Sequence, residues 1–157
     1  LGTDTNGVDG WQAPFEAGTL GESTAYTILA VATDALGNQG TDLTFNATLD
    51  KTSPWMNLEP LITPYVGDHY HLVWEVGDAL SGLSHMDLYY RADGGDWQLL
   101  VSNVPSTMTS YDYDVPGANY VEFRFISYDK AGNSGIHGVG AAKEGYELIF
   151  TYPIFYK

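Results

Sequence analysis

An internal repeat limits the folds open to this chain. Residues 26–40 and residues 121–135 follow one pattern, in which alternating apolar or small side chains lead to an Asp, a Gly-Asn pair and a further Gly. This alternation has the period of a β-strand with one buried face. The repeat therefore predicts two copies of one strand and turn. The alternating positions are Tyr26, Ile28, Ala30 and Ala32 in the first copy and Val121, Phe123, Phe125 and Ser127 in the second; the turn residues are Asp34, Gly37, Asn38 and Gly40 in the first and Asp129, Gly132, Asn133 and Gly135 in the second.

Other alternating segments, bounded by turn formers, predict an all-β fold. No long stretch has sustained helical periodicity. Trp74, Tyr90 and Phe125 fall at inward positions and should belong to the core. The expected strands are residues 26–33, 43–49, 70–76, 86–90, 97–101, 111–115 and 120–128, with a terminal run at 146–156.

Charge and composition exclude several classes of partner. The chain has 157 residues, of which 20 are acidic and 6 are basic, so its formal net charge is -14. Such a charge repels phosphate backbones, and we therefore expect no nucleic-acid partner. No apolar run approaches the roughly 20 residues of a membrane-spanning helix. The absence of cysteine excludes disulfides and thiolate zinc ligands.

The sequence Asp50-Lys-Thr-Ser-Pro54 predicts a domain boundary, because a strand ends there and polar turn formers precede a proline. Residues 54–139 contain three distinctive segments: Val73-Trp74, Leu88 to Arg91 with Asp93-Gly-Gly-Asp-Trp97, and Tyr120 to Asn133. On these segments, residues 54–139 resemble a bacterial or archaeal Ig-like domain of the fibronectin type III kind. The resemblance implies an Ig-like β-sandwich of a secreted or cell-surface protein, with the Trp and the late aromatic strand facing each other in its core.

Residues 1–52 resemble only the C-terminal half of the same module. We therefore expect three parts: the half-domain 1–52, a complete domain 53–140 and a C-terminal strand or tail 141–157. Half a sandwich leaves an apolar face and a strand edge uncovered. The expected partner is the remainder of a longer precursor or another chain, including a second copy in a homo-oligomer; folding back of residues 146–156 is the alternative.

A candidate calcium loop lies near the N-terminus. Asp4, Asn6, Asp9 and Glu16 approach the spacing of a calcium-binding loop, with one residue inserted before Asp9. The insertion disturbs the alternation of ligands, so a plain polar turn is the competing interpretation. We expect that no cofactor is required, with calcium the one candidate.

Three further motifs have a structural and a chemical interpretation. Asp34 and Asp129 are expected to accept hydrogen bonds within tight turns. His69 and His71 lie on one face of a strand and could bind zinc or copper, but the sequence places no third ligand, which favours exposed histidines. Ser84-His85 lacks the context of a hydrolase nucleophile, and adjacent side chains on a strand seldom meet, so no catalytic residue is expected.

Exposed aromatic and Asn side chains offer the remaining candidates. Trp55 and Trp97 are candidate sugar-stacking residues, and Asn46 lies in a glycosylation sequon. We expect a non-catalytic extracellular spacer, stabilising or assembly module. The alternatives are a carbohydrate-binding accessory module of a secreted hydrolase and a strand-exchanging fibre or surface-layer subunit.

Overall fold

The computed structural model describes residues 2–9, 12, 16–61 and 67–142, and for residues 9, 24 and 42–45 it describes the backbone alone. The chain divides into two compact units, Leu1–Lys51 and Thr52–Lys157. No α-helix occurs among the described residues, and the strands form three antiparallel sheets. The expected all-β fold is confirmed.

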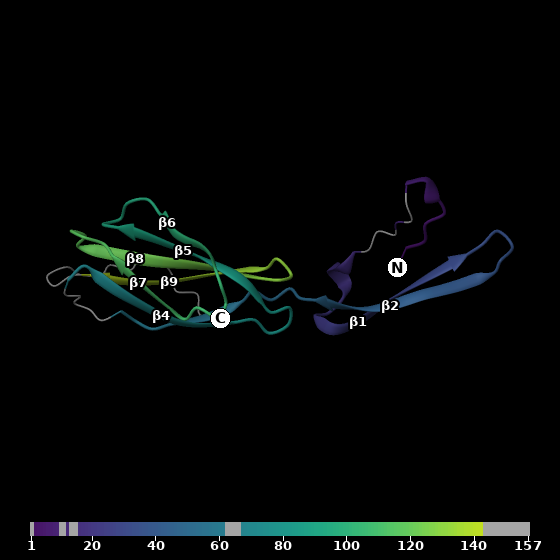
Figure 1. Ribbon diagram of the computed structural model, residues 1–157, viewed down its shortest axis with the longest axis horizontal. Coiled ribbons are helices and arrows are strands. Elements are labelled where there is room, and N and C mark those ends of the chain that lie inside the picture. The colour runs from purple at the N-terminus through teal and green to yellow at the C-terminus, as the bar shows by residue number, and fades with distance from the viewer. Residues whose placement is uncertain (1, 10–11, 13–15, 62–66, 143–157) are drawn as a thin grey trace. The chain divides into compact units, whose positions relative to one another are not determined.

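Unit 1 is built on a long β-hairpin (Figure 1). Strands β1 (Ser23–Thr33) and β2 (Gln39–Leu49) pair antiparallel as a two-stranded sheet. Two single-turn 3-10 helices, η1 (Gly7–Asp9) and η2 (Ala17–Thr19), precede the hairpin. The backbone of Gly37 has a φ of 86°, a left-handed conformation that glycine adopts without a Cβ clash.

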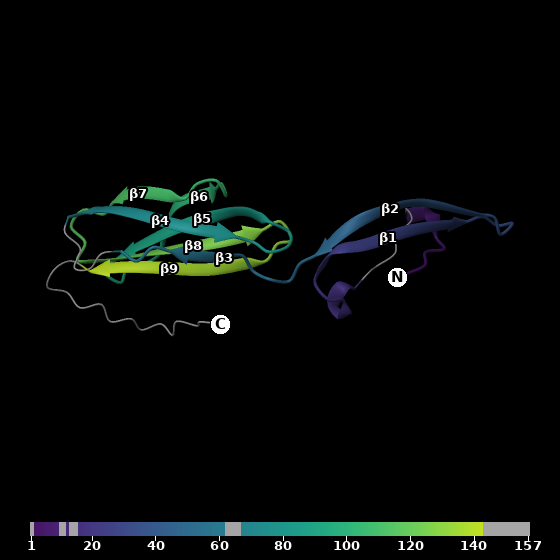
Figure 2. The ribbon, with the colours of Figure 1, turned by 90° about the horizontal axis from the view of Figure 1, so that it is seen from below.

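Unit 2 contains two antiparallel sheets (Figures 1 and 2). One sheet has the strand order β3-β4-β7 and the other has the order β6-β5-β8-β9. The strands are β3 (Trp55–Leu58), β4 (His69–Gly77), β5 (Leu83–Ala92), β6 (Gln98–Val104), β7 (Ser110–Asp114), β8 (Tyr120–Asp129) and β9 (Ser134–Ala142).

Aromatic side chains from the two sheets meet in the core of unit 2. Trp74 of β4 lies 5.0 Å from Phe125 of β8 between ring centroids, and Tyr70 lies 5.5 Å from Phe123. All four side chains are at most 1% exposed. Such tilted ring pairs add about 0.5–1.5 kcal/mol each beyond the burial of their area. The inward side chains of the alternating pattern therefore pack together and form one core between the two sheets.

The predicted strands agree with the structure except at two places. β3 and β9 were missed, because β3 is short and follows a proline, and β9 is rich in glycine. β9 continues to Ala142, which includes the first two residues of the expected C-terminal strand or tail 141–157. The expected run at 146–156 lies outside the described residues. Tyr90 is partly buried against the core, whereas Trp74 and Phe125 are fully buried.

Candidate functional site

The two copies of the repeated turn have the same hydrogen bonds. In each copy the Asp carboxylate accepts the backbone N–H and the side-chain amide of the Asn four residues later. The backbone N–H of the Asn donates to the Asp Oδ1 at 2.8 Å in both copies, from Asn38 to Asp34 and from Asn133 to Asp129. These carboxylates therefore serve the turns, as expected. The hydrogen bonds lower the pKa of Asp34, with the Asn38 side chain as the main cause.

The two copies differ in what surrounds them. In unit 2, β8 pairs with β5 on one edge and β9 on the other. In unit 1, β1 pairs with β2 alone among the described residues. Leu29 and Val31 of β1 are 53% and 50% exposed. The described part of unit 1 thus repeats the last hairpin of the sandwich with one strand edge open and apolar side chains in solvent.

One face of the open hairpin is hollowed. An apolar depression of about 360 Å³ lies against both strands and η2. In unit 2 the corresponding face of β8 is covered by the other sheet, through ring pairs such as Trp74–Phe125. The depression is lined by Ala17, Leu20, Tyr26, Thr27, Ile28, Ala47, Thr48 and Leu49.

The candidate calcium loop uses its side-chain oxygens on backbone N–H groups. Asp4 accepts the N–H of Asn6 at 2.8 Å and that of Gln12 at 2.6 Å, and the Asn6 side chain accepts the N–H of Val8 at 3.2 Å. The bond from Gln12 is the main cause of the lowered pKa of Asp4. Glu16 is exposed, and the Asp9 side chain lies outside the described part. Binding of calcium by these residues stays a prediction.

The two candidate sugar-stacking residues lie on different sheets. Trp55 of β3 is 49% exposed, and its ring lies close over Gly77, which pairs with it. Trp97, just before β6, has the guanidinium of Arg124 at 3.9 Å and that of Arg91 at 4.7 Å from its ring centroid. The structure therefore does not bring the two rings together in one platform. Asn46 of β2 is exposed, and its glycosylation stays a prediction.

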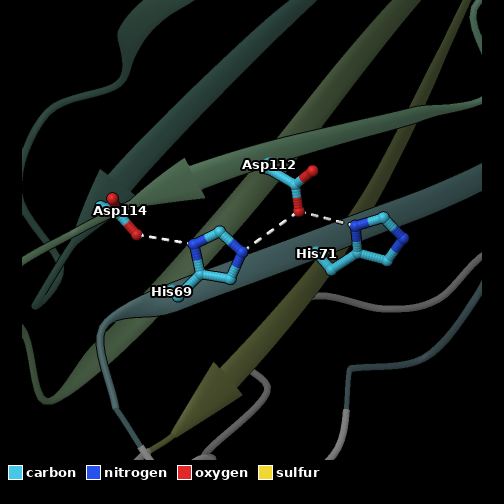
Figure 3. A network of polar contacts seen from close by, with 4 residues as sticks. All are labelled: His69, His71, Asp112 and Asp114. Carbon is cyan, nitrogen blue, oxygen red and sulfur yellow. Dashed lines mark hydrogen bonds and ion pairs between the residues drawn. The ribbon is translucent and has the colours of Figure 1, made fainter.

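His69 and His71 have acidic partners that the sequence did not reveal (Figure 3). Both histidines lie on the exposed face of β4, opposite the buried Tyr70 and Leu72. Register places Asp114 across from His69 and Asp112 across from His71, on the edge strand β7. The sequence predicted a strand at residues 111–115 but did not show that it pairs with β4. It therefore did not indicate that the histidines and the aspartates share one face of the sheet.

One carboxylate oxygen joins the two imidazoles. Asp112 Oδ1 lies 2.7 Å from His71 Nδ1 and 3.2 Å from His69 Nε2. The other ring nitrogen of His69, Nδ1, lies 2.8 Å from Asp114 Oδ1. The contact with Asp114 is the main cause that raises the pKa of His69, and the contact with His71 is the main cause that lowers the pKa of Asp112. The four side chains are 57–73% exposed. Two imidazoles and two carboxylates therefore lie in contact on the exposed face formed by β4 and β7.

A second acidic pair lies at two turns of unit 2. Carboxylate oxygens of Asp78 and Asp129 lie within 4.8 Å of each other. Asp78 Oδ2 accepts the N–H groups of Leu80 and Gly82 at 3.0 and 2.7 Å, while Asp78 Oδ1 is buried with no hydrogen-bond partner among the described residues. Because Asp129 also serves its own turn, both carboxylates have a structural role.

Ser84 and His85 do meet, contrary to expectation. Ser84 Oγ lies 3.0 Å from His85 Nδ1, at a point where the register of β5 against β8 shifts between Leu83 and His85. The His85 ring stacks on Tyr128 at 4.6 Å. His85 has no carboxylate partner among the described residues, whereas an activated nucleophile needs its base oriented by a third group.

Comparisons with known proteins add no identification. No protein-family model matches this chain, and no curated protein matches it. Among the described residues, none of the helical segments is long and apolar enough to cross a membrane.

Proposed function

We propose that this chain is a non-catalytic module of a larger secreted or cell-surface protein, built from bacterial or archaeal Ig-like repeats of the fibronectin type III kind. Its role is that of a spacer, stabilising domain or assembly surface. Unit 2, with three strands in one sheet facing four in the other, agrees with the seven-strand sandwiches of this kind.

The repeated hairpin is the observation that carries the proposal. One copy lies within a sandwich, while the other has an open strand edge, exposed Leu29 and Val31 and an apolar hollow in the described part of the chain. Open edges and uncovered sheet faces favour pairing with another strand. This difference between the two hairpins, one with an open edge and one paired on both edges, is the reason that we propose an assembly role.

We propose that two β-strands, equivalent to β4 and β5 of unit 2, cover the open edge and the hollow of unit 1. They are supplied by the remainder of the precursor or by another chain. In unit 2, β5 places Leu88 opposite Phe125 and Tyr90 opposite Phe123 of β8. A strand of this alternating pattern would pair with β1 in the same way. A strand from the other sheet would then cover the hollow.

Size-exclusion chromatography with light scattering tests the proposal. We expect the chain purified from its own source to elute in a complex larger than its 17.2 kDa, and intact mass measurement identifies the second component. Ile28→Lys places a charge in the apolar hollow that the partner strands would cover, and it should abolish the complex. Leu36→Lys is the matched control, because Leu36 is 89% exposed in the turn. A wild-type chain that stays monomeric over a wide concentration range, with a well-protected β1, would contradict the proposal.

A further inference from the structure

We propose that His69, His71 and Asp112 bind a first-row divalent transition metal ion such as Zn²⁺ on the outer face of the β3-β4-β7 sheet. Two imidazoles and one carboxylate are a common protein ligand set for zinc, with a water or another donor in the fourth position. The inference concerns unit 2 alone and is independent of the proposed assembly role.

The carboxylate oxygen of Asp112 already lies close to a nitrogen of each imidazole. Zinc bonds of about 2.0–2.2 Å in a tetrahedron place neighbouring ligand atoms roughly 3.3–3.5 Å apart. Asp112 Oδ1 lies 3.2 Å from His69 Nε2 and 2.7 Å from His71 Nδ1. A bound metal would replace these direct contacts between the carboxylate and the ring nitrogens. The two imidazole nitrogens must also approach each other, which rotation of the side chains allows because both are more than half exposed.

Asp114 completes the arrangement as a positioning residue. It accepts a hydrogen bond from His69 Nδ1 at 2.8 Å, which leaves Nε2 of the neutral ring free to bind metal. A carboxylate that orients a metal-binding histidine in this way raises its basicity, and its loss costs about 10–100-fold in metal affinity. Asp114 therefore does for His69 what outer carboxylates do in established zinc sites.

The backbone fixes these four side chains on one face. His69 and His71 are two residues apart on β4, and Asp114 and Asp112 are their direct partners on β7. Opposed residues of an antiparallel pair have Cβ atoms about 4.5–5.5 Å apart. The two aspartates also balance the charge of a divalent ion when both histidines are neutral. A metal here would link the edge strand β7 to β4.

Isothermal titration calorimetry of the full chain with ZnCl₂ at pH 7.5 tests the inference. We expect one zinc site whose affinity falls more than about tenfold in His71→Ala and about 10–100-fold in Asp114→Asn. His85→Ala is the matched control, since His85 is a histidine of the other sheet, and it should leave the affinity unchanged. Lowering the pH to 5.5 should weaken binding, because protons compete for the imidazoles.

Two outcomes would overturn the inference. One is a wild-type chain that binds no zinc. The other is zinc binding that persists unchanged in the His69→Ala/His71→Ala double variant or is displaced by millimolar Ca²⁺, because this would assign the zinc to the acidic surface. Since the four side chains are exposed, the variants should fold, and a circular dichroism spectrum equal to that of the wild type verifies this. In NMR spectra, zinc should shift the ring protons of His69 and His71 but not those of His85.

Discussion

Replacing Phe125 by alanine should remove a large part of the stability of unit 2. Phe125 is 1% exposed, its ring packs against Trp74 at 5.0 Å, and Leu88 lies beside it on β5. Truncating a buried Phe costs about 3–5 kcal/mol through lost transfer energy and the cavity left behind. Domains of this size have a free energy of unfolding of about 5–15 kcal/mol, so the variant should be folded but marginal.

The matched control is the neighbouring position on the other face of β8. Ile126 is partly exposed, so Ile126→Ala should cost about 1 kcal/mol. Urea denaturation followed by tryptophan fluorescence and circular dichroism gives both free energies, and the thermal midpoint of Phe125→Ala should fall by more than about 10 °C. A loss below about 1 kcal/mol for Phe125→Ala, or equal losses for the two variants, would refute the packing of the two sheets through this residue.

Three further substitutions test local features of unit 2. Burial lowers the pKa of His137 below its usual 6.5, and a hydrogen bond to the backbone of Pro54 opposes this shift in part. The contribution of the buried neutral ring to the free energy of unfolding is fully present above about pH 6.5, and it is lost as pH falls through the folded pKa. His137→Gln should thus make the free energy of unfolding less pH-dependent between pH 6.5 and 5, and identical slopes would argue against this origin. Gly132→Ala, at a φ of 96° with open space around the added Cβ, should cost about 1–2 kcal/mol in urea titrations, and an unchanged midpoint would contradict the left-handed turn. Glu122→Gln weakens the ion pair with Arg91, whose side chains are 14% and 17% exposed, and should cost about 1–3 kcal/mol; a stability equal to the wild type at low salt would disprove a structural role.

The sequence was sufficient for the all-β class of the fold, because strand alternation and turn signals agreed along most of the chain. Alternation in β4 and β8 correctly assigned Trp74 and Phe125 to the interior, and the spacing of Asp129, Gly132 and Asn133 correctly predicted a tight turn. These features are local, since a strand face and a turn depend on a few neighbouring residues. β9 was missed because its glycines and single histidine give no clear alternation, and its strand state comes from pairing with β8.

The candidate metal site depended on information that local patterns do not carry. His69 and His71 were recognised as a possible ligand pair, but their partners are more than 40 residues away in the sequence. Only the register of β4 against β7 places Asp112 and Asp114 beside them. Likewise, the contact between Ser84 and His85 lies at an irregularity in strand register that the sequence did not indicate.

Hydrogen–deuterium exchange of the purified chain tests most directly whether unit 1 is an open copy of the last hairpin of unit 2. We expect slow exchange for the amides of β8, which pairs on both edges, and fast exchange for those amides of β1 that point away from β2 until a partner strand binds. Binding of the partner should slow exchange in β1 and leave β8 unchanged. Equal and strong protection of β1 and β8 in a chain that light scattering shows to be monomeric would contradict an open strand edge in unit 1.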